Sequence, residues 1–142
     1  MFFNLDKWVG HITETAIKQI SDAFGRRLQN TGITRIQWIA LYFVKINKII
    51  SQRELSNLMN VTDSSAGRLI DRLERDGLIE RNRNESDRRV IYIKLTKNGD
   101  DLITELLPYG EIFNNDLTND ISEEELKIFD KVLKKMQSNV CE

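Results

Sequence analysis

The sequence predicts a mainly helical fold with a small β hairpin, of the α+β class, and three observations support this. Apolar residues recur at spacings of three and four through most of the 142 residues, which is the period of an amphipathic helix. Residues 90–95 instead alternate along the chain, as in a half-buried strand. Serine or threonine stands at the N-cap position of several helical stretches. With 40% hydrophobic residues, this length predicts a single domain over residues 1–142.

Two helical stretches are expected before the centre of the chain. The first, within residues 1–30, carries an apolar stripe that a small domain cannot cover alone. Its members are Leu5, Trp8, Val9, Ile12, Ala16, Ile20 and Phe24. The second runs over residues 33–44, with these residues expected to face inward: Ile36, Ile39, Ala40, Phe43 and Val44.

A short helix, a turn and another helix are predicted after residue 50. Ser51 and Glu54 have the spacing of a capping box, and Asn60-Val61 makes the turn before the N-cap Thr62. The second helix directs one apolar face to the core: Ala66, Leu69, Ile70 and Leu73. Its opposite face is small and charged: Ser64, Ser65, Gly67, Arg68, Asp71, Arg72 and Arg75. For an isolated helix, such a face is most often simply solvated.

A hairpin is predicted after this helix. Asp76-Gly77 closes the helix, because glycine adopts the left-handed conformation of the C′ position. Residues 78–81 and 90–95 then read as paired strands, with a polar run between them. A helix-turn-helix followed by a hairpin is the winged helix-turn-helix, a reader of duplex DNA, and we expect it over residues 33–99.

The tip of the hairpin, residues 83–89, carries three arginines: Arg83, Arg88 and Arg89. Such a loop suits the phosphate backbone or a minor groove. Asp87 lies two residues before Arg89 and can brace its guanidinium, which reduces the entropy lost on binding. The alternative is a solvated tip whose charges only prevent edge association.

These features together resemble the MarR family of winged-helix transcriptional regulators of bacteria and archaea. The resemblance is carried by residues 52–55, 61–65, 68–81, 87–89 and 95–99, with Ile33-Thr34 and Gln37-Trp38 upstream and Leu117 and residues 122–126 downstream. It implies regulation of nearby genes, often relieved by a small phenolic or amphipathic ligand. The function expected is a homodimeric, sequence-specific DNA-binding regulator, a repressor. The alternative is a winged-helix protein-interaction module without specific DNA binding.

DNA contacts are expected from the second helix and from the hairpin tip. Short side chains allow close approach to a major groove, and Arg68 can reach a guanine edge. By resemblance, Ser64, Ser65, Arg68 and Arg72 lie at the major groove, Asp87 with Arg89 at the adjacent minor groove, and Arg88 at phosphate. The full expected set is Ser64, Ser65, Gly67, Arg68, Arg72, Asp87, Arg88 and Arg89. Contacts to the DNA backbone are further expected from Ser51, Gln52, Thr62 and Arg83.

The last third of the chain is expected to be helical. A linking helix over residues 97–116 follows the N-cap Thr96, with a bend near Pro108, because proline removes a helical hydrogen bond. A final helix begins at Ser122 with a second capping box and this apolar stripe: Leu126, Phe129, Val132, Leu133 and Met136.

Residues 1–30 and 112–142 are expected to be dimerisation helices, although each stripe could instead cover the chain's own core. A twofold dimer places two reading helices roughly 34 Å apart, one turn of DNA, and predicts an inverted-repeat operator. The formal charge of −1 divides into +4 for residues 1–50, +2 for residues 51–99 and −7 for residues 100–142. We expect so acidic a segment to lie away from the DNA.

The sequence also predicts a pocket for an effector. Aromatic residues with a neighbouring histidine and arginine can line a cleft for an amphipathic ligand, although aromatics at helical spacing are usually core. The candidates are Trp8, His11, Arg35, Trp38 and Tyr42.

Other classes of function find no support in the residues. One histidine and one thiol, Cys141, cannot build a typical zinc site, and no cofactor or metal is expected. No catalytic constellation or phosphate-binding glycine loop is visible, so an enzyme is not expected. Met1-Phe2-Phe3 is followed at once by polar and charged residues, unlike a signal peptide, and no apolar run is long enough to span a bilayer. We therefore expect a cytoplasmic protein.

Overall fold

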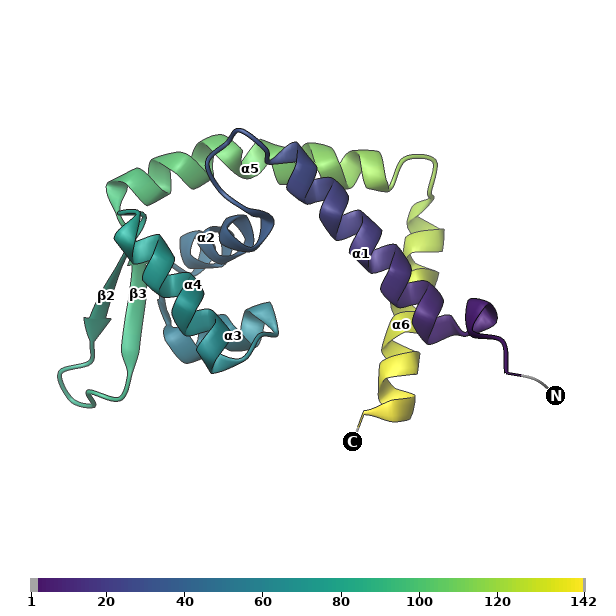
Figure 1. Cartoon of the computed structure of the whole chain (residues 1–142), viewed down its shortest axis with the longest axis horizontal. Helices are drawn as coiled ribbons and strands as arrows, with labels where there is room; N and C mark the ends of the chain where they lie inside the picture. Colours follow the sequence, from purple (N-terminus) through teal and green to yellow (C-terminus); the bar gives the residue numbers. More distant parts are fainter. Residues whose placement is uncertain (1–2, 142) are drawn as a thin grey trace. The chain divides into compact units, whose positions relative to one another are not determined.

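The computed structural model describes residues 3–141, and the chain divides into two compact units after Gly110. Residues 1, 2 and 142, at the ends of the two expected dimerisation segments, lie outside the described residues. The elements in Figure 1 are the 3-10 helix η1 (Leu5–Lys7), α1 (Val9–Arg27), α2 (Arg35–Asn47), β1 (Ile49–Ser51), α3 (Gln52–Met59), α4 (Asp63–Arg75), β2 (Ile79–Arg83), β3 (Ile91–Leu95), α5 (Lys97–Leu117) and α6 (Glu123–Val140). The predicted α+β class, mainly helical, is confirmed.

The sheet has three antiparallel strands in the order β1-β3-β2, one more than the predicted hairpin. β1 is only three residues long, which is too short for its alternation to be seen in the sequence. The first hairpin strand was predicted over residues 78–81, and in the structure it lies over Ile79–Arg83. Leu78 precedes β2, and the strand continues until Arg83 pairs with Ile91, because the ladder of β3 offers partners that far.

Local capping explains where the helices of the first unit begin and end. The Thr34 hydroxyl and the Gln37 side chain form a complete capping box, so α2 begins at Arg35. Asn60, which ends α3, is in the left-handed conformation at φ 54°. After α4, Gly77 has φ +74°, and the Leu78 N–H donates to the Leu73 carbonyl at 2.9 Å. The helix thus ends in a Schellman motif, and the left-handed glycine predicted at Asp76-Gly77 is confirmed.

The core of the first unit gathers side chains from α2, α3, α4, the sheet and α5. On α2 the buried positions are spaced three, four and seven apart: Gln37, Ala40, Leu41 and Val44. Ile36 was predicted to face inward, and this is wrong, because it lies one residue off that stripe and is 37% exposed. On α4, Ala66, Ile70 and Leu73 are buried and Leu69 is half-buried, as predicted.

The expected N-terminal stripe is interrupted where α1 begins. Asn4 caps a single 3-10 turn by accepting a hydrogen bond from the Asp6 N–H at 2.9 Å, and Trp8 is extended. Leu5 and Trp8 had been predicted to lie on one regular helix with the residues after Val9. This prediction is wrong, because a 3-10 turn and an extended Trp8 precede the helix. Along α1 itself, Val9, Ile12 and Ile17 are exposed, whereas Phe24 is buried.

α5 continues through Pro108 to Leu117. Its start is capped by Thr96, whose hydroxyl accepts from the Gly99 N–H at 3.0 Å and donates to the Gly77 carbonyl at 2.6 Å. The boundary between the two compact units follows Gly110, two residues after Pro108. The bend predicted for α5 near Pro108 therefore stays a prediction.

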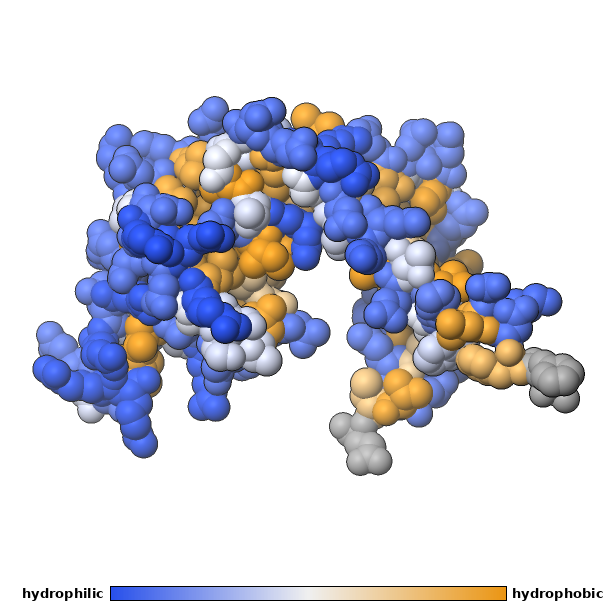
Figure 2. All heavy atoms as spheres, viewed as in Figure 1, coloured by the Kyte–Doolittle hydropathy of each residue, from blue (hydrophilic) through white to orange (hydrophobic). Residues whose placement is uncertain are grey.

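In the second unit, Ser122 and Glu125 form the predicted capping box of α6. Four large apolar side chains of this helix are exposed: Ile128, Phe129 (61%), Val132 and Val140. Apolar side chains among the polar ones are visible at the molecular surface in Figure 2. None of the helices described here has the length and apolar character needed to span a bilayer.

Candidate nucleic-acid interface

The outer face of α4 presents the side chains that the sequence singled out. Ser64, Ser65, Arg68 and Arg72 are exposed and Gly67 is half-buried. The Thr62 hydroxyl accepts a hydrogen bond from the Ser65 N–H at 3.2 Å and lies 3.2 and 3.0 Å from the hydroxyls of Ser64 and Ser65. The first turn of α4 therefore combines a cluster of hydroxyls with the positive end of the helix dipole.

Three arginines follow one another along this face. Within residues 3–141, no ion pair joins Arg68, Arg72 or Arg75 to a carboxylate. They line an open depression of about 490 Å³ whose other walls include Ile36 and Leu69. Their guanidinium donors are therefore available to phosphate or base edges.

Two of the three acidic residues of α4, Asp71 and Glu74, are paired with the sheet, whereas Asp63 accepts a hydrogen bond from the Ser56 hydroxyl at 2.8 Å. Arg81 of β2 donates to the Asp71 carboxylate, and also to Glu74 at 3.2 Å. Partial burial alone would lower the pKa of Arg81, but the hydrogen bonds to Asp71 and Glu74 outweigh it and raise the pKa above its ordinary value. No role was predicted for Arg81 from the sequence. Its position in the strand was the signal that could have suggested one. Arg81 is a charged residue two positions after the buried Ile79, so both lie on the same face of the strand.

The tip between β2 and β3 is held by its own hydrogen bonds. The Asn84 side-chain oxygen accepts from the backbone N–H groups of Ser86 at 2.8 Å and Asp87 at 3.3 Å. Arg83 donates to the Arg88 carbonyl at 2.8 Å. Arg83, predicted to contact the DNA backbone, therefore already braces the tip, while its side chain stays exposed.

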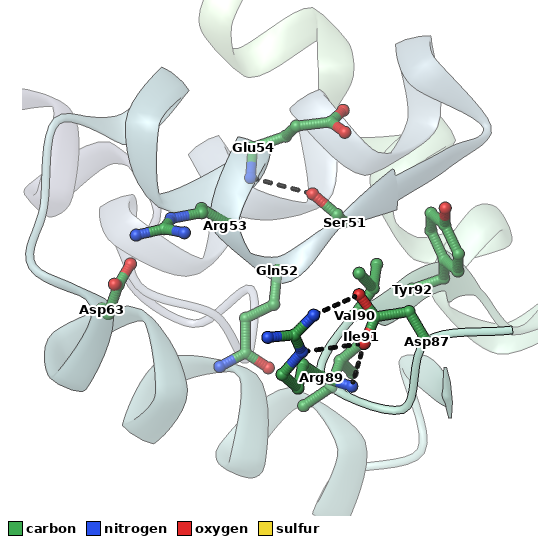
Figure 3. A pocket seen from close by; sticks show the side chains of 10 residues that line it. All are labelled: Ser51, Gln52, Arg53, Glu54, Asp63, Asp87, Arg89, Val90, Ile91 and Tyr92. Atoms are coloured by element: carbon green, nitrogen blue, oxygen red, sulfur yellow. Dashed lines mark hydrogen bonds and ion pairs between the residues drawn. The ribbon is translucent and has the colours of Figure 1, made fainter. Parts of the chain in front are cut away.

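The predicted pairing of Asp87 with Arg89 is confirmed (Figure 3). The Asp87 carboxylate accepts from Arg89 Nε at 3.1 Å, from Nη2 at 3.3 Å and from the Arg89 backbone N–H at 3.1 Å. These hydrogen bonds lower the pKa of Asp87. The bonds from the Arg89 side chain have the larger effect and the bond from its backbone N–H the smaller one. The Arg89 side chain is 92% exposed, so it projects from the tip in a restricted direction.

An open groove of about 830 Å³ lies between the hairpin and the starts of α3 and α4 (Figure 3). Its lining residues are Ser51, Gln52, Arg53, Glu54, Asp63, Asp87, Arg89, Val90, Ile91 and Tyr92. The Gln52 side-chain oxygen is buried and has no hydrogen-bond partner among residues 3–141. Ser51 and Gln52, which are predicted to contact the DNA backbone, therefore line the same groove as the Asp87–Arg89 pair.

Besides Arg83, two more of the four predicted backbone contacts, Ser51 and Thr62, have structural roles in the fold. Ser51 is only 8% exposed, and its hydroxyl accepts from the Glu54 N–H at 3.1 Å. The Ser51 side chain thus serves as the buried cap of α3, and its expected DNA contact stays a prediction. Thr62 caps α4 but remains exposed.

The five residues predicted to line an effector pocket fall into two groups, with Arg35, Trp38 and Tyr42 on α2 and Trp8 and His11 at the start of α1. Trp38 and Tyr42 stack at 5.7 Å, and Trp38 packs edge-on against Phe24 at 5.2 Å. The start of α1, with Trp8 and His11, lies about 20 Å along the helix from Phe24, at 1.5 Å per residue. Trp38 Nε1 also donates to the Leu106 carbonyl at 2.8 Å, which makes Trp38 a packing residue. Trp8 instead packs edge-on against Phe3, and the predicted effector cleft stays a prediction.

Gly67 offers a test of how closely DNA approaches α4. A Cβ at this position would meet only the Gln52 side-chain nitrogen at 3.6 Å, so the fold has room for a methyl group. We expect Gly67→Ala to stabilise the chain by about 0.5–1 kcal/mol, because alanine loses less backbone entropy in a helix. If bases approach this face, the same change weakens DNA binding about tenfold, or about 1.4 kcal/mol. Thermal unfolding and duplex titration measure the two effects, and unchanged binding would contradict a close approach at Gly67.

Comparison with known proteins places these features in a family. A model of the MarR family matches residues 31–90. YsmB of Bacillus subtilis (strain 168), an uncharacterized HTH-type transcriptional regulator, is 32% identical over 135 residues, covering 94% of this chain and 89% of YsmB.

Solved structures agree in fold. A structure of Bordetella bronchiseptica BpsR, from work on regulation of its DNA binding by 6-hydroxynicotinic acid, superposes with a TM-score of 0.86 at 20% identity and covers 96% of this chain and 98% of that one. The S. aureus MepR–DNA complex superposes with a TM-score of 0.85 at 22% identity, covering 94% and 98%.

Proposed function

The chain belongs to the MarR family and is a DNA-binding transcriptional regulator, and from this premise we propose that it is a repressor that binds an inverted-repeat operator as a homodimer. In this proposal α4 enters the major groove with Ser64, Ser65, Gly67, Arg68 and Arg72. The tip of the hairpin, with Asp87, Arg88 and Arg89, lies at the adjacent minor groove and its phosphates.

The observation that supports this proposal best is the contrast between the charges of α4. Its acidic residues Asp71 and Glu74 are paired with Arg81, whereas Arg68, Arg72 and Arg75 have no carboxylate partner in the described part of the chain. Arginines left unpaired on one face of a capped helix are what recognition of phosphate and guanine requires. The exposed Arg89, already oriented by Asp87, adds a second cationic contact.

The proposed dimer is supported by apolar side chains exposed in each unit. Val9, Ile12 and Ile17 of α1 are more than half exposed, as are Ile128 and Phe129 of α6. Large apolar groups exposed along helices at both ends of the chain favour cover by a second copy. The proposal thus keeps residues 1–30 and 112–142 as dimerisation segments.

A small amphipathic ligand that releases DNA is part of the same proposal. Regulation of BpsR by 6-hydroxynicotinic acid is a finding about that protein, and it motivates the same kind of control here. Because Trp8 and His11 lie far along α1 from Trp38, the ligand site is left to a screen of aromatic acids against the DNA complex.

Selection of bound sequences from random duplex DNA, at one fixed salt concentration, tests the proposed function. We expect an inverted repeat with half-sites about one helical turn apart, and sedimentation of the selected complex should show two chains per duplex. The affinity should fall with salt at a slope of about −0.9 per phosphate contacted. No enriched sequence, or a monomer at micromolar concentration, would favour a protein-interaction module instead.

A further inference from the structure

We propose that Arg81 is a positioning residue, which keeps Asp71 away from Arg68 and Arg75 so that the arginines of α4 remain available to DNA. This proposal deepens the proposed function and rests on it. It assigns to the sheet an effect on DNA recognition that needs no contact between Arg81 and DNA.

Arg81 forms one ion cluster with two carboxylates of α4. Arg81 reaches from β2 to α4, where it donates to both Asp71 and Glu74. Its side chain is 23% exposed, whereas those of Asp71 and Glu74 are 61% and 44% exposed. The arginine is thus the more buried partner, and it holds two carboxylates at the rim of the α4 face.

Asp71 lies between two arginines of its own helix. Asp71 follows Arg68 by three residues and precedes Arg75 by four. Side chains three and four apart are neighbours on a helix, with about 5–6 Å between their Cβ atoms, and opposite charges at these spacings attract. Asp71 therefore has two arginines of its own helix within reach, and in this structure it pairs with Arg81 instead.

A carboxylate released on this face of α4 would oppose DNA binding in two ways. A carboxylate that pairs with Arg68 occupies the donors that a guanine edge would use. An unpaired carboxylate on the same face repels nearby phosphates, and this repulsion is strongest at low salt. By holding Asp71, Arg81 avoids both effects.

A double-mutant cycle on the full chain tests this proposal. Arg81→Met, Asp71→Asn and the double variant are titrated with the duplex that the wild-type chain selects, at about 50 mM and about 200 mM salt. We expect Arg81→Met to weaken binding about tenfold at the lower salt, and Asp71→Asn in that background to restore most of the loss. We also expect Arg81→Met to reduce the preference for the base pair that Arg68 reads, a change that a merely structural role would not produce selectively.

Lys94→Met is the matched control. Lys94 lies on the neighbouring strand, pairs with Glu80 at 3.6 Å, and its loss changes the net charge equally without touching α4. We expect it to bind like the wild type. If Arg81→Met melts below the assay temperature, Arg81→Lys replaces it, with an intermediate loss and the same rescue by Asp71→Asn expected.

Two results would overturn the proposal: wild-type affinity and base preference in Arg81→Met, or an equal loss with and without Asp71→Asn. Both presuppose a wild-type chain that selects a duplex. If the wild type selects none, the proposed function itself has failed, and the two failures are thereby distinguished.

Discussion

Replacing Arg68 by alanine is expected to weaken binding to the preferred duplex by about 1–3 kcal/mol, or roughly 5- to 150-fold, because a bidentate arginine–guanine contact has this value. Arg68 is exposed, lies one turn after the N-terminus of α4 and has no carboxylate partner in the described residues. Binding to unrelated duplexes should change much less. Titration of the selected duplex and of one with the contacted base pair exchanged measures both effects.

Arg75→Ala and Arg72→Ala are the controls on the same helix. Arg75 lies two turns beyond Arg68, at the C-terminal end of α4, so its loss should have the smaller effect. Arg72→Ala should weaken binding to all sequences alike, as loss of a phosphate contact does. If Arg68→Ala also weakened every duplex equally, Arg68 would be a phosphate contact, and base recognition would have to come from elsewhere.

Replacing Gly99 by alanine is expected to destabilise the first unit by about 3 kcal/mol, the upper range for a forced steric overlap in a core. A Cβ at Gly99 would lie 1.9 Å from the Leu78 carbonyl oxygen, and that atom belongs to the backbone and cannot turn aside. The same carbonyl accepts from the Thr96 N–H at 3.1 Å, so the start of α5 and the start of β2 would have to separate. The melting temperature should fall by about 10 °C for a domain of this size.

Gly25→Ala is the matched control for this prediction. Gly25 is also helical, and a Cβ there would meet nothing within 4 Å. Alanine at this position should therefore stabilise the chain slightly, as in other helix interiors. A Gly99→Ala variant with an unchanged melting temperature would show that α5 can move relative to β2 at little cost.

Much of the fold could be predicted because its signals are local. Thr62 and Ser122 are good caps by residue type, and Gly77 suits a positive φ, so their helices begin and end near the predicted residues. The Asp87–Arg89 pair was also predictable, since the partners are two residues apart. Strand β1 and the exposure of Ile36 were not, because a three-residue strand has no visible period and Ile36 is as apolar as the buried residues of α2.

The site divides in the same way. By itself, the amino-acid sequence determined which residues could read DNA: small and basic side chains on one face of a capped helix, and arginines at a tight turn. Only the tertiary structure decided which of those side chains are available. Ser51 became a buried cap, Arg83 a brace of the hairpin tip, and Asp71 a partner of Arg81, ten residues away in the sequence. The physical reason is that hydrogen bonds and ion pairs depend on distances in space, and periodicity reports only the face on which a side chain lies.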